Sequence, residues 1–151
     1  MSDPFQLDRF VDAQGPVYEQ AMQELLAGRK ASHWMWYVFP QLRGLGRTPT
    51  AQRYGIASLA EAQAYLAHPR LGPRLVECVA SVLSVEGRTS EQIFGYPDYL
   101  KFRSCLTLFG TAAPDVPVFR EALARYYGGD ADPLTLECLA QGHAQADQAP
   151  R

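Results

Sequence analysis

The sequence predicts an all-α fold, a compact single-domain bundle of short helices. Helix-capping patterns recur along the chain, and the segments that follow them repeat apolar residues at helical spacing. The chain has 151 residues, of which 47% are hydrophobic, so it has the size of one domain and can form a core. We expect the helical domain over residues 1–141. Residues 142–151 are polar and Ala/Gln-rich without apolar periodicity, which predicts a flexible C-terminal tail.

The first part of the chain predicts two helices and leaves room for one short strand. Asp3 is expected to cap a helix whose first residue is Pro4, a position that proline favours. A second helix is expected to begin near Pro16 and to end at Gly28, because glycine commonly terminates helices. The aromatic run Trp36–Phe39 is compatible with a short strand. We expect no sheet of more than two strands.

Two capping boxes mark helix starts further along the chain. Ser58 with Glu61, and Thr89 with Gln92, have the spacing at which two side chains satisfy the free backbone N–H groups of a helix start. Proline in the first turn marks the expected starts of further helices at Pro73, Pro97, Pro117 and Pro133.

Composition excludes several classes of protein. The net charge of −2 gives no overall basic surface, which argues against DNA as a partner. The first ten residues already carry three charged side chains, unlike a signal peptide, and no apolar run nears the roughly 20 residues that span a bilayer. We therefore expect a cytoplasmic protein that makes no membrane contact. The sequence leaves the oligomeric state open.

The cysteines and histidines predict structural roles rather than metal chemistry. Three widely spaced cysteines do not form the pattern of a disulfide framework or of a zinc site. Cys78 and Cys105 lie on apolar helical stripes, so we expect them to be buried and unreactive, whereas Cys138 should label faster. No two histidines are close in sequence, so we expect no metal site, and no cofactor is implied.

One segment differs from the rest of the chain in charge. No acidic residue occurs between Glu24 and Glu61. This acid-free segment, residues 25–60, carries five basic side chains, which leaves a net charge of −7 for the remainder. The segregation predicts a local positive potential that the overall charge hides. The five basic residues are Arg29, Lys30, Arg43, Arg47 and Arg53.

The same segment places glycines and aromatic residues beside the basic ones. Gly44 and Gly46 lie between Arg43 and Arg47, and a glycine turn can present backbone N–H groups to an anion. Guanidinium groups bind phosphate or carboxylate in a forked geometry, and aromatic rings stack on a base or a sugar. The residues expected to bind a ligand are Lys30, His33, Trp36, Gln41, Arg43, Gly44, Gly46, Arg47, Tyr54, Lys101 and Ser104.

Four of these residues, Lys30, His33, Arg43 and Arg47, are expected to converge on one partly exposed cleft. Whether the protein is an enzyme stays open; His33 is the best candidate for a catalytic acid or base, because imidazole titrates near neutral pH. A structural interpretation stands beside this one. Arg43 and Arg47 would then pair with acids elsewhere in the fold, and a lone histidine would have no chemical role.

The structural interpretation extends to the neighbouring residues. Trp34 and Phe39 are expected to lie in the core, because large aromatic residues dominate protein interiors. Lys101 and Ser104 share a helical face in the expected helix and could extend the pocket. The alternative is that Lys101 is solvated and that Ser104 bonds its own backbone.

The stretch KASHWMWYVFPQLRGLGRTPTAQRYGI resembles the signature of a bacterial family of small proteins of unknown function, whose members carry SHWMWFIFPQLRGLG. Three later stretches also match: EAQAYLAHPRLGPRLVEC, EQIFGYPDYLKFRSCLTLF and VFREALARYYGGDADPLTLECL. The resemblance covers Phe5 to Leu139; Tyr37 stands where the family often has Phe, and Cys105 where it often has Ser. It implies a standalone, mainly helical cytoplasmic domain and no particular activity. The calpastatin-like label that such proteins sometimes carry does not fit a packed domain, because that inhibitor is a long disordered chain.

Two functions follow from the basic, aromatic-rich segment. The first is the binding of a small anionic ligand, a nucleotide or a phosphorylated metabolite, in a concave cleft. The second is a protein or RNA interaction module that uses the same basic surface without catalysis, on a flatter patch.

Overall fold

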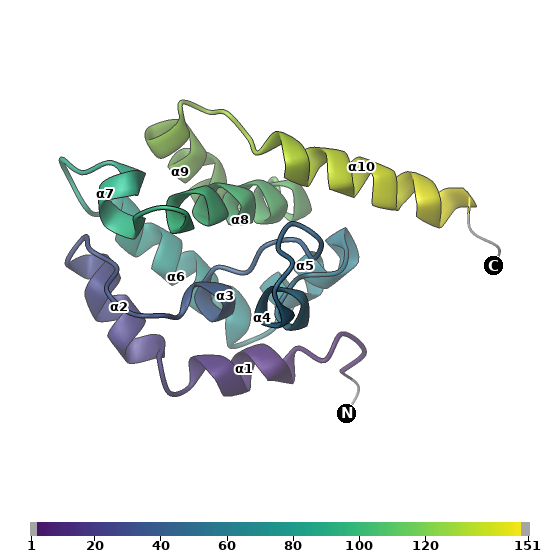
Figure 1. The fold of residues 1–151 in the computed structure, drawn as a ribbon, viewed down its shortest axis with the longest axis horizontal. Coiled ribbons are helices and arrows are strands. Elements are labelled where there is room, and N and C mark those ends of the chain that lie inside the picture. The colour runs from purple at the N-terminus through teal and green to yellow at the C-terminus, as the bar shows by residue number, and fades with distance from the viewer. Residues whose placement is uncertain (1–2, 149–151) are drawn as a thin grey trace.

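Ten helices joined by short turns make up the described part of the chain (Figure 1). The computed structural model describes residues 3–148, with side chains through Gln141. The helices are α1 (Asp8–Gln14), α2 (Tyr18–Leu26), α3 (Met35–Val38), α4 (Pro49–Arg53), α5 (Leu59–Ala67), α6 (Leu71–Leu83), α7 (Ser90–Phe94), α8 (Asp98–Ala112), α9 (Pro117–Tyr127) and α10 (Pro133–Gln148). Within residues 3–148 the β pairing is limited to one isolated bridge between Leu42 and Ile56. The predicted all-α, compact single domain is confirmed.

The core is organised around α8, which packs against α5 and α9. Phe102 and Phe109 of this helix are fully buried. The Phe102 ring stacks on Phe94 with centroids 4.5 Å apart and meets Phe39 edge-on at 4.9 Å. Both are favoured aromatic geometries. Trp34 and Phe39 are 0% and 1% exposed, so the interpretation of these two residues as core is confirmed.

Both predicted capping boxes mark helix starts. At the start of α7 the Gln92 N–H donates to Thr89 Oγ1 at 3.1 Å, and the Thr89 N–H donates to Gln92 Oε1 at 2.9 Å. At the start of α5 the Glu61 N–H donates to Ser58 Oγ at 3.1 Å, but the Glu61 carboxylate accepts from the Ala57 N–H instead of completing the box. The other oxygen of Glu61 is therefore available to a partner far away in sequence.

The first helix begins later than predicted. The Asp3 carboxylate does act as a cap, but it accepts from the N–H groups of Leu7 and Asp8, so α1 begins at Asp8 rather than at Pro4. Residues 3–7 form the turn that precedes this helix. The second helix, α2, begins at Tyr18, near Pro16 as predicted.

The prediction that residues Trp36–Phe39 could form a short strand is wrong. These residues lie in and just after the short helix α3, because the Trp34 carbonyl accepts from the N–H groups of Tyr37 and Val38. Tertiary packing of the aromatic rings decides the local structure here, against their strand propensity. The helix α4 was also not predicted from sequence. Thr48 caps it by accepting from the Ala51 N–H at 3.1 Å.

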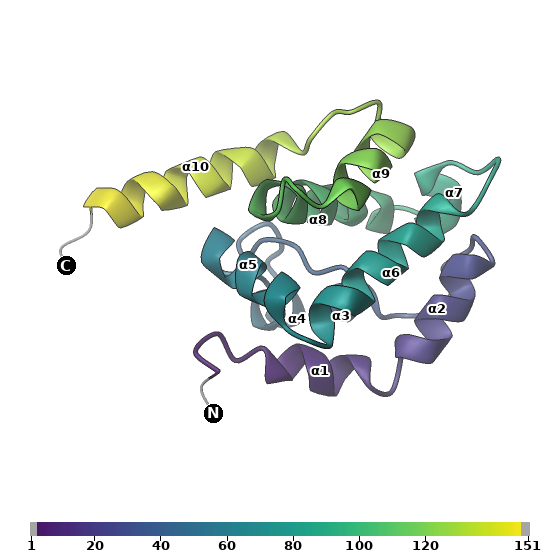
Figure 2. The same ribbon diagram turned by 180° about the vertical axis from the view of Figure 1, so that it is seen from behind.

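The C-terminal helix extends further than predicted. Residues 142–148 continue α10, which projects from the helical body (Figure 2). Alanine and glutamine are good helix formers, so a segment without an apolar stripe still extends an existing helix. Residues 149–151 lie outside the described part, and the flexibility of the predicted tail stays a prediction. No helix within the described chain combines the length and the apolar character that a membrane span requires.

The cysteines lie as the sequence predicted. Cys78 and Cys105 are buried, and Cys138 is half-buried. Burial raises the pKa of the Cys78 thiol to about 12 and that of Cys105 well above its ordinary value. Because the thiolate is the reactive form, both groups are held in their unreactive state.

Candidate functional site

The acid-free segment is anchored at its start by Glu24. The Oε1 atom of this buried carboxylate accepts from the N–H groups of Ala31 at 2.7 Å and Ser32 at 3.0 Å, and from the indole of Trp34 at 2.9 Å. Its Oε2 atom accepts from the Ser32 hydroxyl at 2.6 Å and the Gln20 amide at 2.8 Å. Burial opposes the charged form, but these donors outweigh it and lower the pKa of Glu24 to about 2.

Lys30 belongs to this anchored region and not to an open cleft. Its Nζ atom forms an ion pair with Asp98 at 2.8 Å and donates to the Ser32 carbonyl at 2.7 Å. It also lies 5.2 Å from the centre of the Trp34 ring. The side chain is 8% exposed, so its charge is already neutralised and shielded from solvent.

Further along, residues 41–43 and 54–56 lie side by side. The Ile56 N–H donates to the Gln41 carbonyl at 2.9 Å, and the Arg43 N–H donates to the Ile56 carbonyl at 2.7 Å. Gly55 permits this approach, because a Cβ atom there would lie 2.7 Å from the Arg43 Cα. The pairing fixes the position from which the Arg43 side chain extends.

A hollow of about 490 Å³, which we call the arginine hollow, lies beside this pairing. Its volume is within the usual range for small-ligand sites. Three arginines and one glutamate line it, for a formal net charge of +2. The lining residues are Pro4, Phe5, Gln6, Arg9, Arg43, Arg53, Ala57 and Glu61.

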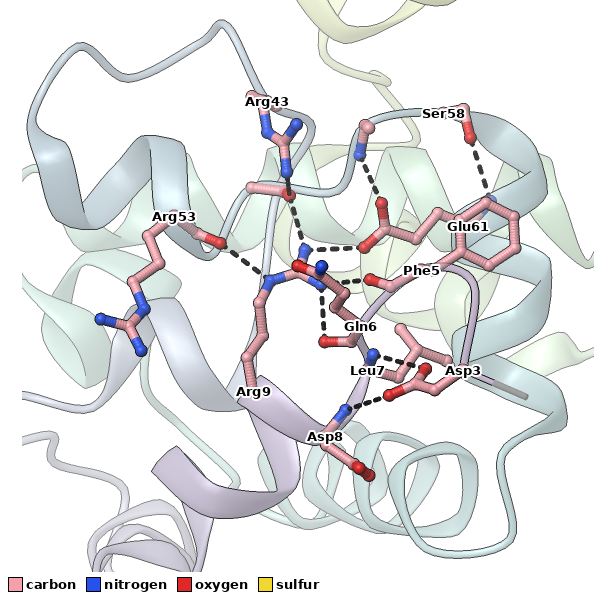
Figure 3. A network of polar contacts seen from close by, with 12 residues as sticks. Asp3, Phe5, Gln6, Leu7, Asp8, Arg9, Arg43, Arg53, Ser58 and Glu61 are labelled. Carbon is pink, nitrogen blue, oxygen red and sulfur yellow. Dashed lines mark hydrogen bonds and ion pairs between the residues drawn. The ribbon is translucent and has the colours of Figure 1, made fainter. Parts of the chain in front are cut away.

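Arg9 holds the walls of the arginine hollow together (Figure 3). Its Nη2 atom donates to Glu61 at 2.7 Å and to the Gly55 carbonyl at 3.1 Å. Its Nε atom donates to the Arg53 carbonyl at 2.8 Å, and its Nη1 atom binds two carbonyls of the turn before α1. All five N–H groups of the guanidinium are therefore used within the protein. Glu61 neutralises the charge of Arg9.

Arg43 is a cation of the arginine hollow that has most of its hydrogen-bond donors unused. Its side chain is exposed and makes one long hydrogen bond, from Nη2 to the Gly55 carbonyl at 3.3 Å. That carbonyl also binds Arg9, so two guanidinium groups approach the same oxygen (Figure 3). No ion pair within residues 3–141 involves Arg43. Arg53 lies at the rim, with its guanidinium 5.4 Å from the centre of the Tyr54 ring.

A second, narrower space brings together four of the residues predicted to bind a ligand. Trp36, Gln41, Tyr54 and Lys101 line this aromatic slot, whose volume of about 10 Å³ has room for one water molecule. The Lys101 ammonium lies 4.8 Å from the centre of the Trp36 ring and 3.4 Å from Asp98. The slot therefore already contains a cation on an aromatic face.

Of the four residues predicted to converge, one lines either of these two spaces. Arg43 lines the arginine hollow, while Lys30, His33 and Arg47 line neither the arginine hollow nor the aromatic slot. His33 is exposed in the turn between the Glu24 anchor and α3. Arg47 is exposed, and its backbone carbonyl accepts from the Gln52 amide at 3.5 Å.

The remaining predicted residues have structural surroundings. Gly44 has a φ of +103°, which favours glycine, and open space beside it. A Cβ atom on Gly46 would lie 2.6 Å from the Cβ of Ala51 in α4, so glycine lets the loop approach this helix. Ser104 is buried and donates to Asp132 at 2.9 Å and to the Leu100 carbonyl at 3.2 Å, as the structural interpretation of that residue expected.

Sequence reasoning missed Arg9, which lies in α1, and Gln6, which lies in the turn before that helix. Arg9 and its partner Glu61 are 52 residues apart, so no local pattern reveals the pair. Among the described residues, no group of His, Cys, Asp and Glu side chains is arranged to hold a metal ion.

Comparisons place the chain among proteins whose role is not stated. The family described as "Protein of unknown function (DUF1810)" matches residues 4–139. The crystal structure of the conserved hypothetical protein Rv1873 from Mycobacterium tuberculosis is similar, with 59% sequence identity and a TM-score of 0.90. The match covers 91% of this chain and 99% of that one. No curated protein matches the chain.

Proposed function

Because the chain belongs to the DUF1810 family of proteins of unknown function, its role has to be inferred from its own site, and we propose that it binds a small anionic ligand in the arginine hollow. A nucleotide or a phosphorylated metabolite has the required charge. The observation that carries the proposal is Arg43, an exposed guanidinium with one 3.3 Å hydrogen bond at the edge of a 490 Å³ hollow. Four of its five N–H groups remain for a ligand.

The electrostatics of the hollow support an anion. Arg9 is neutralised by Glu61 and is fully bonded, so its role is to hold the walls. Arg43 and Arg53 add two charges that have no carboxylate partner within residues 3–141. A phosphate bound by a forked guanidinium forms charge-assisted hydrogen bonds, each worth roughly 1.5–3 kcal/mol. The concave shape favours a small ligand over the alternative, a protein or RNA interaction module on the same surface.

The test compares two arginines of one loop. Inorganic phosphate is titrated into the wild-type protein, Arg43→Ala and Arg47→Ala at constant ionic strength, with binding followed by calorimetry and by the midpoint of thermal unfolding. We expect phosphate to stabilise the wild type, since a ligand that binds the native state raises its stability. Arg43→Ala should weaken binding about 10- to 100-fold. Arg47→Ala, which removes the same charge outside the hollow, should leave binding nearly unchanged.

Two further results complete the design. Arg43→Lys should bind phosphate more weakly than the wild type, because lysine cannot form a planar two-point contact. Unfolding of Arg43→Ala in buffer without phosphate should be unaltered, since an exposed side chain with one long hydrogen bond contributes little stability. Equal losses in Arg43→Ala and Arg47→Ala would indicate nonspecific screening and would exclude the proposed site.

A further inference from the structure

Gln6 has an unusual backbone conformation at the wall of the arginine hollow. Its φ is +56°, and no other non-glycine residue in the described chain has a positive φ. The left-handed region costs an ordinary L-residue about 1 kcal/mol or more. Glycine would avoid that cost, so the presence of a long amide side chain here needs an explanation.

Three contacts impose this conformation on Gln6. The Arg9 Nη1 atom donates to the Phe5 carbonyl at 2.6 Å and to the Gln6 carbonyl at 3.0 Å. The Gln6 N–H donates to the Asp3 carbonyl at 3.0 Å. The turn is thus closed on one side by Asp3 and on the other by Arg9, which also binds Glu61 and Gly55 on the opposite wall.

The side chain of Gln6 is placed to meet a ligand. It lines the same hollow as Arg43, and Figure 3 shows it beside the Arg9 guanidinium. Its backbone is held, but the residue is exposed, so its amide is accessible to a ligand. An amide offers both a donor and an acceptor, which suits a hydroxyl or carbonyl group rather than a second phosphate.

We propose that Gln6 is a specificity-determining residue of this site and that the ligand is a phosphate monoester of a hydroxylated compound, such as a phosphorylated sugar or a nucleotide. This inference rests on the proposed anion site: Arg43 binds the phosphate, and Gln6 binds a hydroxyl group next to it. Arg9 is a positioning residue that sets the Gln6 backbone. The hydrogen bonds from Arg9 and to Asp3 hold the left-handed backbone against its strain, and so keep the amide at the hollow.

The test uses three probes and one variant that relaxes the backbone. Gln6→Gly removes the amide while glycine accepts the positive φ, so the variant should fold at least as stably as the wild type. Inorganic phosphate, methyl phosphate and glycerol 3-phosphate are titrated into both proteins. The wild type should prefer glycerol 3-phosphate over methyl phosphate by about five- to tenfold, the effect of one neutral hydrogen bond. Gln6→Gly should lose this preference, while inorganic phosphate still binds in an Arg43-dependent manner.

Each outcome decides one of the two proposals. If no probe binds the wild type in an Arg43-dependent manner, the anion site fails and the role of Gln6 fails with it. If all three probes bind and Gln6→Gly keeps the preference for glycerol 3-phosphate, the role of Gln6 alone is overturned. Gln6→Asn, whose side chain also tolerates the left-handed region, should retain part of the preference.

Discussion

Glu24 and Glu61, which bound the acid-free segment, hold it in different ways. Glu24 accepts five hydrogen bonds from neutral donors and pairs with no cation within the described chain. Glu61 accepts from the Ala57 N–H at 3.0 Å and pairs with Arg9 at 2.7 Å. The Glu24 end is closed and packed, whereas the Glu61 end adjoins the arginine hollow.

The difference shows that local charge alone does not make a binding site. Both ends of the segment are basic in sequence, but Lys30 is neutralised by Asp98 and buried against Trp34. Arg43 has no such partner among residues 3–141 and is exposed. A basic residue becomes available to a ligand only where the fold leaves its donors unused.

The largest expected effect is a loss of stability on substitution of Glu24, at the closed end of the segment. Glu24→Gln should lower the free energy of unfolding by roughly 3 kcal/mol at neutral pH, the size that corresponds to its lowered pKa. The neutral amide imitates the protonated acid and accepts these hydrogen bonds less strongly. Urea unfolding measures the change. Glu19→Gln, on the exposed face of the same helix α2, is the matched control and should change stability by less than about 0.5 kcal/mol.

A smaller effect is expected from the glycines that shape the open end. Gly55→Ala should destabilise the protein by about 2 kcal/mol, because its Cβ atom would lie 2.7 Å from the Arg43 backbone. The same change should weaken phosphate binding, since it displaces Arg43. Gly44→Ala has open space around it, so its cost should be limited to about 1 kcal/mol from its positive φ. Thermal unfolding and phosphate titration of both variants test this order; equal destabilisation would contradict it.

Acid should remove the contribution of Glu24 to stability in a graded way. The folded-state pKa of Glu24, about 2, is below its ordinary value of 4.5, so its contribution is full above about pH 4.5 and is lost as the pH falls toward 2. The wild type should therefore lose about 1.4 kcal/mol per pH unit more than Glu24→Gln within this window. Urea midpoints between pH 2.5 and 7 measure the difference. Parallel curves for the two proteins would show that Glu24 is not held in its charged form.

The sequence predicted the features that depend on neighbours in the chain. The Thr89–Gln92 capping box, the Ser58 cap, the core positions of Trp34 and Phe39, and the burial of Cys78 and Cys105 all follow from local patterns and are confirmed. The strand allowed at residues 36–39 was wrong because packing of the rings in three dimensions overrides local propensity.

Ion pairs between residues far apart in the chain could not be predicted from such local patterns. Lys30 meets Asp98 from another helix, and Arg9 meets Glu61, so the sequence could not show which basic residue is neutralised. Arg43 and the residues of the aromatic slot were among the predicted ligand-binding residues, but Arg9 and Gln6 were not. Both residues lie near the start of α1, which is at Asp8 and not at Pro4 because Asp3 caps the helix from the preceding turn. That position of the helix start depends on how residues 3–7 pack.

The smallest expected effect concerns His33, the predicted candidate for a catalytic acid or base. It is exposed, and it lies between Ser32 and Trp34, whose donors are both fixed by Glu24. It lines neither the arginine hollow nor the aromatic slot. His33→Ala should therefore change stability by less than about 0.5 kcal/mol, since it removes an exposed side chain from a backbone held by other residues. Phosphate binding should be unchanged as well, because Arg43 is positioned by Gly55 and Ile56 instead. Titration of His33→Ala beside Arg43→Ala makes the comparison direct. A clear loss of phosphate binding in His33→Ala at unaltered stability would contradict the placement of the phosphate site in the arginine hollow.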